Sequence, residues 1–321
     1  MKLIIQIPCF NEEDTLAATI ADLPEAIEGI DEIERLIVDD GSTDKTVETA
    51  RALGVDHIVS YPNNRGLAHA FSAGVDACLR LGADVIVNTD ADNQYCGADI
   101  EKLVEPILAG RAEIVIGERP IDDIEHFSSQ KKRFQKIGSR VVRIASGTSV
   151  PDAPSGFRAY TRDAAMRINV INEYTYTLET IIQAGMNKIP IESVPIRTNP
   201  QTRQSRLFKN MWSYMFRSAS IIFRSIMMYR PLKFFVSIGA VIAVIGLVFV
   251  IRFVVIAIID SPEGHIQSLV LSAMMVMVGM QFIVSGMQAN IISANRKILE
   301  DIQLKVRESY YSKAEPEEDK E

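Results

Sequence analysis

The sequence predicts an α/β domain with a mostly parallel sheet, followed by two apolar helices long enough to cross a membrane. Short apolar runs alternate with helical segments through residues 1–196, which is typical of parallel strands joined by helices. Polar residues gather directly after several of these runs, where sheets of this class bind their ligands. Between Phe234 and Asn295, only three side chains are charged, and this run carries the membrane prediction.

The predicted strands of the α/β domain are short and bounded by turn residues. They cover 3–7, ending at Pro8, and then 35–38, 57–60, 84–88 and 113–117. Helices are expected from about residue 12, from Ser42 or Thr43 to 53, and over 67–81 and 98–108. Strands separated by single helices at this spacing favour a mostly parallel sheet.

Three of the predicted strand ends carry acidic and amide side chains. They are Pro8-Cys9-Phe10-Asn11-Glu12-Glu13, Asp39-Asp40-Gly41-Ser42 and Asn88-Thr89-Asp90-Ala91-Asp92-Asn93-Gln94. Any one of them reads as a turn followed by a helix cap, because Asp and Asn favour both. Three at one edge of a sheet predict a shared ligand site instead.

Asp90, Asp92 and Gln94 have the spacing of a metal site. Oxygen-bearing side chains two residues apart in an extended loop can face one hard cation. Mg²⁺ and Mn²⁺ prefer such ligands and leave room for phosphates. An Asp-x-Asp pair is common by chance, but this one directly follows an apolar strand. The sequence therefore predicts a divalent cation at this strand end.

Residues 234–259 and 266–295 form the predicted membrane hairpin. The first segment begins with 18 uncharged residues and the second has 30, and about 20 apolar residues span a bilayer core. A buried helical hairpin of a soluble protein is the alternative, although two such runs in succession are rare outside membranes. Arg252 is expected to reach the far interface or to pair within an oligomer. Gly279 and Gly286 favour close helix packing, which makes a homo-oligomer one expectation.

Basic residues flank this hairpin on one side. Lys233 precedes the first span and Arg296 and Lys297 follow the second, whereas the loop 260–265 holds two acids and no Lys or Arg. The positive-inside rule predicts that the α/β domain and both termini are cytoplasmic, in an inner or cell membrane crossed twice. The three cysteines lack metal or redox spacing and fit a reducing compartment.

The net charge of −7 over 321 residues is unevenly distributed. As an average it argues against nucleic acid or an anionic membrane as a partner. Residues 197–233, however, hold eight basic residues and no acidic one, and 131–143 form a second acid-free basic block. Within 208–229, apolar residues recur at helical spacing opposite a basic face, which predicts a helix in the membrane interface. We therefore expect a lipid bilayer, and no nucleic acid, as partner.

Several motifs, taken as a set, resemble those of a known enzyme family. The segments 8–13, 38–44, Asn64-Arg65-Gly66 and 90–94 together resemble the family 2 glycosyltransferases of the GT-A fold. With Ser155-Gly156-Phe157-Arg158, the stretch 203–206 and the two spans, the chain resembles the polyprenyl-phosphate glycosyltransferases within that family. These include dolichol-phosphate mannose synthase and undecaprenyl-phosphate glucosyltransferases. The resemblance implies a GT-A, Rossmann-like catalytic domain over 1–207, a juxtamembrane amphipathic helix over 208–233, two transmembrane helices over 234–295 and a cytoplasmic tail over 296–321.

The resemblance also implies roles for individual residues. Asp90, Asp92 and Gln94 would hold Mg²⁺ or Mn²⁺ against the donor pyrophosphate, and Arg119 would bind phosphate. Phe10 stands where the family usually has tyrosine, and Arg206 where lysine is commoner. The donor, a UDP- or GDP-hexose, would be bound by Pro8, Phe10, Glu12, Val38, Asp39, Asp40, Asp90 and Ala91, together with Arg203, Ser205 and Arg206 on a loop near the phosphates.

The acceptor that the resemblance implies is a polyprenyl phosphate. Its second pKa is about 6, so near neutral pH it is mostly a dianion that needs cations and a route from the membrane rather than a strong base. Arg133 is the residue expected to bind this phosphate, and its basic block also suits anionic lipid headgroups. Asp152 is expected either to orient the sugar or to act as a base, with a plain turn before Pro154 as the remaining interpretation.

The expected function is inverting transfer of a hexose from a nucleotide sugar to polyprenyl phosphate at the cytoplasmic face. Transfer to a lipid hydroxyl is one alternative, and it requires a base. A polysaccharide synthase is another, disfavoured because the sequence has no downstream Gln-x-x-Arg-Trp string and only two predicted spans. A binding protein with an inactive domain is disfavoured by the complete set of Asp90, Asp92 and Gln94.

Overall fold

A computed structural model describes residues 1–120, 129–171, 175–200, 219–220, 223–224, 227–229, 231–259 and 266–312, without the side chains of 129–135 and 312. The chain divides into two compact units. The α/β unit comprises Met1–Ile222 and Leu304–Glu321, and the hairpin unit comprises Phe223–Gln303. Most of 208–233 lies outside the described residues, so the interfacial helix expected there remains a prediction.

The α/β unit is built on a seven-stranded sheet in the order β3-β2-β1-β4-β6-β5-β7. Strand β6 runs antiparallel to β4 and β5, and the other paired neighbours are parallel. This confirms the mostly parallel α/β fold. The strands are β1 (Lys2–Cys9), β2 (Glu32–Asp39), β3 (His57–Ser60), β4 (Val85–Asn88), β5 (Ile114–Glu118), β6 (Arg158–Thr161) and β7 (Ile191–Pro195).

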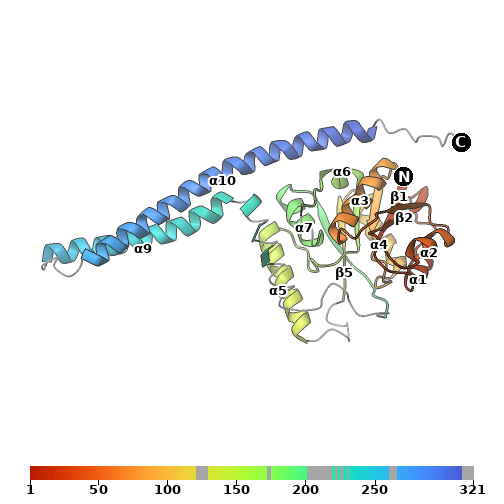
Figure 1. The fold of residues 1–321 in the computed structure, drawn as a ribbon, viewed down its shortest axis with the longest axis horizontal. Helices are drawn as coiled ribbons and strands as arrows, with labels where there is room; N and C mark the ends of the chain where they lie inside the picture. Colours follow the sequence, from red (N-terminus) through yellow and green to blue (C-terminus); the bar gives the residue numbers. More distant parts are fainter. Residues whose placement is uncertain are drawn as a thin grey trace. The chain divides into compact units, whose positions relative to one another are not determined.

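Helices cover both faces of this sheet (Figure 1). On one face α3 (Leu67–Arg80) packs against β1 and β2, and α6 (Arg162–Arg167) packs against β6. Helix α7 (Thr177–Met186) belongs to the same face, because the ring of Tyr176 at its start stacks on Phe71 of α3 at 3.8 Å. The other face is covered by α1 (Leu16–Ala21), α2 (Thr46–Ala52) and α4 (Ile100–Leu108), which follows the short turn η1 (Gly97–Asp99), while α5 (Ser129–Ser146) packs on α7.

The alternation of side chains along β1 explains this layering. Leu3, Ile5 and Ile7 are fully buried in the core beneath α1 and α4. Gln6 points to the opposite face, where Gly74 of α3 comes so close that an added Cβ would lie 2.3 Å from Gln6 Oε1. A residue larger than glycine at 74 would require the side chains of Gln6 and Val38, or α3 itself, to shift.

Strand β1 runs two residues further at its carboxyl end than its sequence predicts. Pro8 was expected to end the strand, but β1 continues to Cys9, with Pro8 in register with Val38 of β2. Strand β4 pairs with β1 only as far as Gln6. Beyond that point the β4 side of β1 opens, which gives a site for ligands at the carboxyl ends of the strands.

The hairpin unit consists of α9 (Pro231–Ile259) and most of α10 (Ile266–Ser312). Both helices are long and apolar enough to cross a membrane, and only 6% and 17% of their most apolar windows are buried, unlike core helices of a soluble protein. The two helices lie side by side (Figure 1), and a Cβ at Gly239 or Gly279 would lie 2.6 Å from the carbonyl oxygen of the other glycine. The small residues that suggested self-association are therefore used for packing within the chain.

Candidate active site

The carboxyl ends of β1, β2 and β4 meet at the opened edge of the sheet. The backbone N–H of Asp40 donates to the Cys9 carbonyl at 2.9 Å, and that of Thr89 donates to the Gln6 carbonyl at 3.1 Å. These bonds bring the loops after the three strands together, as the sequence predicts.

Asp39 and Asp40 have partners within the protein. Asp39 accepts hydrogen bonds from the Ser42 N–H at 3.0 Å and the Ser60 hydroxyl at 2.7 Å. Asp40 accepts from the backbone N–H groups of Arg65 and Gly66 at 2.9 and 2.7 Å, where Gly66 has a φ of 97°. Asp40 thus holds the two residues that lead into α3, and each carboxylate keeps acceptor capacity for a ligand.

The remaining residues predicted for the nucleotide differ in exposure. Phe10, at the end of β1 after Pro8, is 38% exposed. Glu12 is buried, and its Oε2 accepts from the Thr15 hydroxyl at 2.9 Å. Val38 is fully buried, with Cγ2 only 2.9 Å from where a Cβ of Gly74 would lie. Val38 therefore offers a ligand its backbone and not its side chain.

Asp90 and Asp92 place two carboxylates close together at this edge. Burial and the negative charge of Asp92 raise the pKa of Asp90 to about 7. Two carboxylates held together in a partly buried loop repel one another, and a divalent cation between them would remove that cost. The donor chemistry of Asp90, Asp92 and Gln94 therefore fits Mg²⁺ or Mn²⁺.

Hydrogen bonds shape the loop that carries these ligands. The Gln94 N–H donates to Asp92 Oδ1 at 3.2 Å, and the Thr19 hydroxyl donates to the Ala91 carbonyl at 2.9 Å. In the described part of the chain, no group of three or more His, Cys, Asp and Glu side chains forms a metal cluster. Gln94 would add an amide oxygen to the carboxylates of Asp90 and Asp92.

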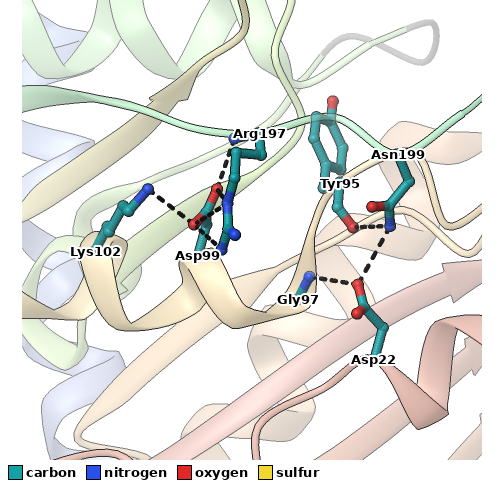
Figure 2. Close-up of polar contacts among 7 residues, drawn as sticks. All are labelled: Asp22, Tyr95, Gly97, Asp99, Lys102, Arg197 and Asn199. Atoms are coloured by element: carbon teal, nitrogen blue, oxygen red, sulfur yellow. Dashed lines mark hydrogen bonds and ion pairs between the residues drawn. The ribbon is translucent and has the colours of Figure 1, made fainter.

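Residues 197–199, which follow β7, bind the chain just after this loop, as Figure 2 shows. Arg197 donates from its guanidinium to Asp99 Oδ1 at 2.8 Å and from its backbone N–H to Asp99 Oδ2 at 2.6 Å. Lys102 adds a contact to Asp99 at 2.9 Å. Burial would raise the pKa of Asp99, but these hydrogen bonds hold it below the usual range. Asp99 is thus a buried anchor for the chain after β7.

Asn199 binds the backbone at the end of the loop 90–94, and Figure 2 shows its side-chain contacts. Its backbone N–H donates to the Gln94 carbonyl at 2.8 Å. Its side-chain amide donates to the Tyr95 carbonyl at 3.2 Å and to Asp22 at 3.3 Å. Asp22 also accepts from the Gly97 N–H at 2.6 Å. The backbone around Gln94 is therefore fixed from two sides.

Arg119 and Asp152 lie together in the structure as a buried ion pair. Arg119 Nε donates to Asp152 Oδ2 at 2.7 Å and Nη2 donates to Oδ1 at 3.0 Å. Burial alone would lower the pKa of Arg119, but the Asp152 carboxylate raises it above the ordinary value. The two N–H groups of the guanidinium hold the Asp152 carboxylate in one orientation. This geometry favours an orienting role for Asp152 over a role as base.

Arg158, at the end of the Ser155–Arg158 motif, shapes the loop that holds Asp152. It is fully buried and donates to the carbonyls of Ser155 and Ala153 at 2.7 and 2.8 Å and to the Thr180 hydroxyl at 2.7 Å. Arg158 therefore stabilises the backbone of residues 153–155.

Some of the predicted residues lie outside the described part of the chain. Arg203, Ser205 and Arg206 are among them, and of Arg133 only the backbone, within α5, is described. Conversely, Tyr95, Arg197 and Asn199 belong to the site although the sequence reasoning did not select them. Tyr95 could have been predicted because it directly follows Gln94. No local sequence pattern links residue 199 to residue 94.

Comparisons with known proteins agree with this geometry. The family model described as glycosyl transferase family 2 matches residues 4–168. A UDP-N-acetylglucosamine–dolichyl-phosphate N-acetylglucosaminyltransferase of Methanococcus voltae is 30% identical over 61% of this chain and 86% of its own length. An undecaprenyl-phosphate 4-deoxy-4-formamido-L-arabinose transferase of Yersinia pestis is 26% identical over 95% of this chain and 91% of its own.

A solved structure supports the fold. The glucosyl-3-phosphoglycerate synthase of Mycobacterium tuberculosis, in complex with Mn²⁺, UDP and glucosyl-3-phosphoglycerate, superimposes with a TM-score of 0.54 at 18% identity. The match covers 70% of this chain and 79% of that one.

Proposed function

The chain belongs to glycosyl transferase family 2, and from that premise we propose that it transfers a hexose from a nucleotide sugar to a polyprenyl phosphate at the cytoplasmic face of a membrane. It is a glycosyltransferase, and its relatives include enzymes named for dolichyl and undecaprenyl phosphate. The observation that carries the proposal is the buried Arg119–Asp152 pair beside the Asp90 and Asp92 carboxylates, in a chain that also has two helices able to span a bilayer.

The donor half of the site follows from the acidic loop. Asp90, Asp92 and Gln94 are the residues that would hold Mg²⁺ or Mn²⁺. When bound, the cation supplies positive charge to the pyrophosphate of the leaving nucleoside diphosphate. Asp39 and Asp40 organise the neighbouring loops, and Phe10 offers an exposed aromatic face for the base or ribose. Arg203, Ser205 and Arg206 are proposed to contact the donor phosphates.

The transfer itself is a single displacement. An oxygen of the acceptor phosphate forms a bond to the anomeric carbon, and the bond from that carbon to the donor's β-phosphate oxygen breaks. The electron pair leaves with the nucleoside diphosphate, so the configuration inverts. Because the acceptor phosphate is already an anion near neutral pH, no strong base is required. This matches the engagement of Asp152 by Arg119, which leaves the guanidinium charged and oriented.

Helix α5 supports a location at the membrane surface. Ile137, Val141 and Ile144 form an exposed stripe at helical spacing, with Ile144 72% exposed. The adjacent Lys136 and Arg140 are exposed as well, whereas the opposite face of the helix is buried. An apolar stripe flanked by cations suits the interface of an anionic bilayer. Arg133 on the same helix is proposed to bind the acceptor phosphate.

The orientation in the membrane is proposed from the charges. Arg296 and Lys297 follow the second span, and the loop 260–265 carries no Lys or Arg. The positive-inside rule then supports cytoplasmic placement of the α/β unit and both termini.

A donor screen tests the proposal. Purified protein is incubated with labelled UDP- and GDP-hexoses, Mg²⁺ or Mn²⁺, and undecaprenyl or dolichyl phosphate. We expect one donor to give an acid-labile lipid-linked sugar, and Asp92→Ala to remove that product while the protein stays folded. If no donor gives such a product, the proposal is wrong.

A further inference from the structure

Tyr95 follows Gln94 directly and is held rigidly. Its ring is buried and stacks on Phe157, with centroids 4.9 Å apart and planes 6° from parallel. Its backbone forms an antiparallel bridge with Thr198, and its carbonyl accepts from the Asn199 amide at 3.2 Å (Figure 2). Both the ring and the backbone of Tyr95 are therefore fixed before any ligand binds.

The hydroxyl of Tyr95 and the carboxylate of Asp90 face the same glycine. The Gly156 N–H donates to the Tyr95 hydroxyl at 3.1 Å. A Cβ on Gly156 would lie 3.1 Å from both carboxylate oxygens of Asp90. Tyr95 also lowers the pKa of Asp90 as a hydrogen-bonding neighbour of its carboxylate, against the effect of burial. Because the hydroxyl accepts a hydrogen bond from the Gly156 N–H, its own proton is available for Asp90.

We propose that Tyr95 is a positioning residue for Asp90, whose carboxylate it orients for a divalent cation through its hydroxyl. The inference deepens the proposed function, on which it rests, since it concerns the same metal site. Asp92 repels Asp90 and would turn its carboxylate aside, whereas a fixed donor on a rigid ring opposes that rotation. Donors behind a metal ligand commonly change metal affinity by about 10- to 100-fold.

Tyr95→Phe isolates the hydroxyl because phenylalanine keeps the stacked ring. Binding of Mn²⁺ is measured from the free-ion electron paramagnetic resonance signal, with UDP present and with GDP in a parallel series. We expect the dissociation constant for Mn²⁺ to rise about tenfold, with a lower melting temperature without metal because the Gly156 N–H loses its acceptor. The Mn²⁺ concentration for half-maximal transfer should rise in parallel, with kcat at saturating Mn²⁺ retained.

Two further variants make the outcome decisive. Tyr160→Phe removes a hydroxyl from another buried tyrosine, on β6, and should bind Mn²⁺ like the wild type. Asp90→Asn should lose Mn²⁺ binding. If Asp90→Asn loses binding while Tyr95→Phe retains it, the inference is wrong and the proposed function stands. Equal weakening in Tyr160→Phe would also overturn it, by indicating loosened packing. If Asp90→Asn binds Mn²⁺ normally, the proposed metal site fails and the inference fails with it.

Discussion

Arg119 and Asp152 form a two-pronged ion pair inside the α/β unit, with Nε–Oδ2 and Nη2–Oδ1 distances of 2.7 and 3.0 Å. Both side chains are buried, so neither exchanges its partner for water at low cost. The pair fixes where the positive charge of Arg119 lies. The proposed acceptor is already an anion and needs no base, whereas a neutral hydroxyl would need one.

Substituting Asp152 distinguishes a role in orienting Arg119 from a role as the base. Asp152→Asn keeps the shape but loses the charge that holds Arg119, and a misplaced cation is expected to lower kcat by about 100-fold. The acidic limb of the pH–rate profile should remain, because the acceptor phosphate, with a pKa of about 6, sets it. Steady-state kinetics from pH 5 to 9 check this. Disappearance of that limb in the variant would instead identify Asp152 as the base.

Substituting Asp40 is expected to change the free energy of unfolding more than the KM for the donor. Its two oxygens accept from the Arg65 and Gly66 N–H groups at the start of α3. Asp40→Ala should lower the free energy of unfolding by about 1–2 kcal/mol, measured by urea denaturation of the detergent-solubilised protein. Asp40→Asn, which keeps one acceptor oxygen, should lose less. An unchanged unfolding curve together with a raised KM for the donor would point to direct contact with the nucleotide.

The raised pKa of Asp90 predicts a pH-dependent response to metal. Its pKa in the folded protein is about 7, above the value of about 3.9 for an unfolded chain. The stability that its protonated form contributes is fully present below the unfolded value and is lost as pH rises through about 7. Mn²⁺ competes with that proton, so it should raise the melting temperature more at pH 8 than at pH 6. Asp90→Asn should abolish the difference, and an equal shift at both pH values in the wild type would contradict this account.

The C-terminal end of α10 is expected to be a fixed part of the α/β unit. Arg307 donates to the carbonyls of Met166 and Ile168 at 2.8 and 3.0 Å, at the end of α6. Tyr311 is buried, and its hydroxyl bonds Asp76 of α3. Tyr311→Ala should therefore speed amide hydrogen exchange over 304–312. Tyr310→Ala, at an exposed neighbouring position, serves as the control and should change exchange much less. Equal exchange in both variants would mean that Tyr311 does not anchor the helix end.

Local patterns in the sequence predict the strands that carry continuous apolar runs. Strands β1 to β5 and both apolar helices belong to this group, as does the convergence of three polar strand ends. Strand β7 was missed because it is only partly buried and its apolar residues alternate with polar ones. Strand β6 was missed because it opens with Arg158, an arginine that is buried only because three acceptors surround its guanidinium.

The pairings within the site depend on tertiary structure. Arg119 and Asp152 are 33 residues apart in the chain, and Asp99 and Arg197 are 98 apart. No hydrophobic period or turn signal connects such positions, so sequence reasoning could name Arg119 and Asp152 separately but could not pair them. The resemblance places Val38 among the donor-binding residues, whereas the structure buries its side chain in the core.

The most direct test of the account compares two acceptors that share one lipid chain. The protein, in anionic vesicles with Mn²⁺ and its labelled nucleotide sugar, is offered undecaprenyl phosphate or undecaprenol. The account predicts an acid-labile sugar phosphodiester from the phosphate and no product from the alcohol. Transfer to the alcohol, or equal transfer to both, would contradict it, because the proposed mechanism relies on an acceptor that is already an anion.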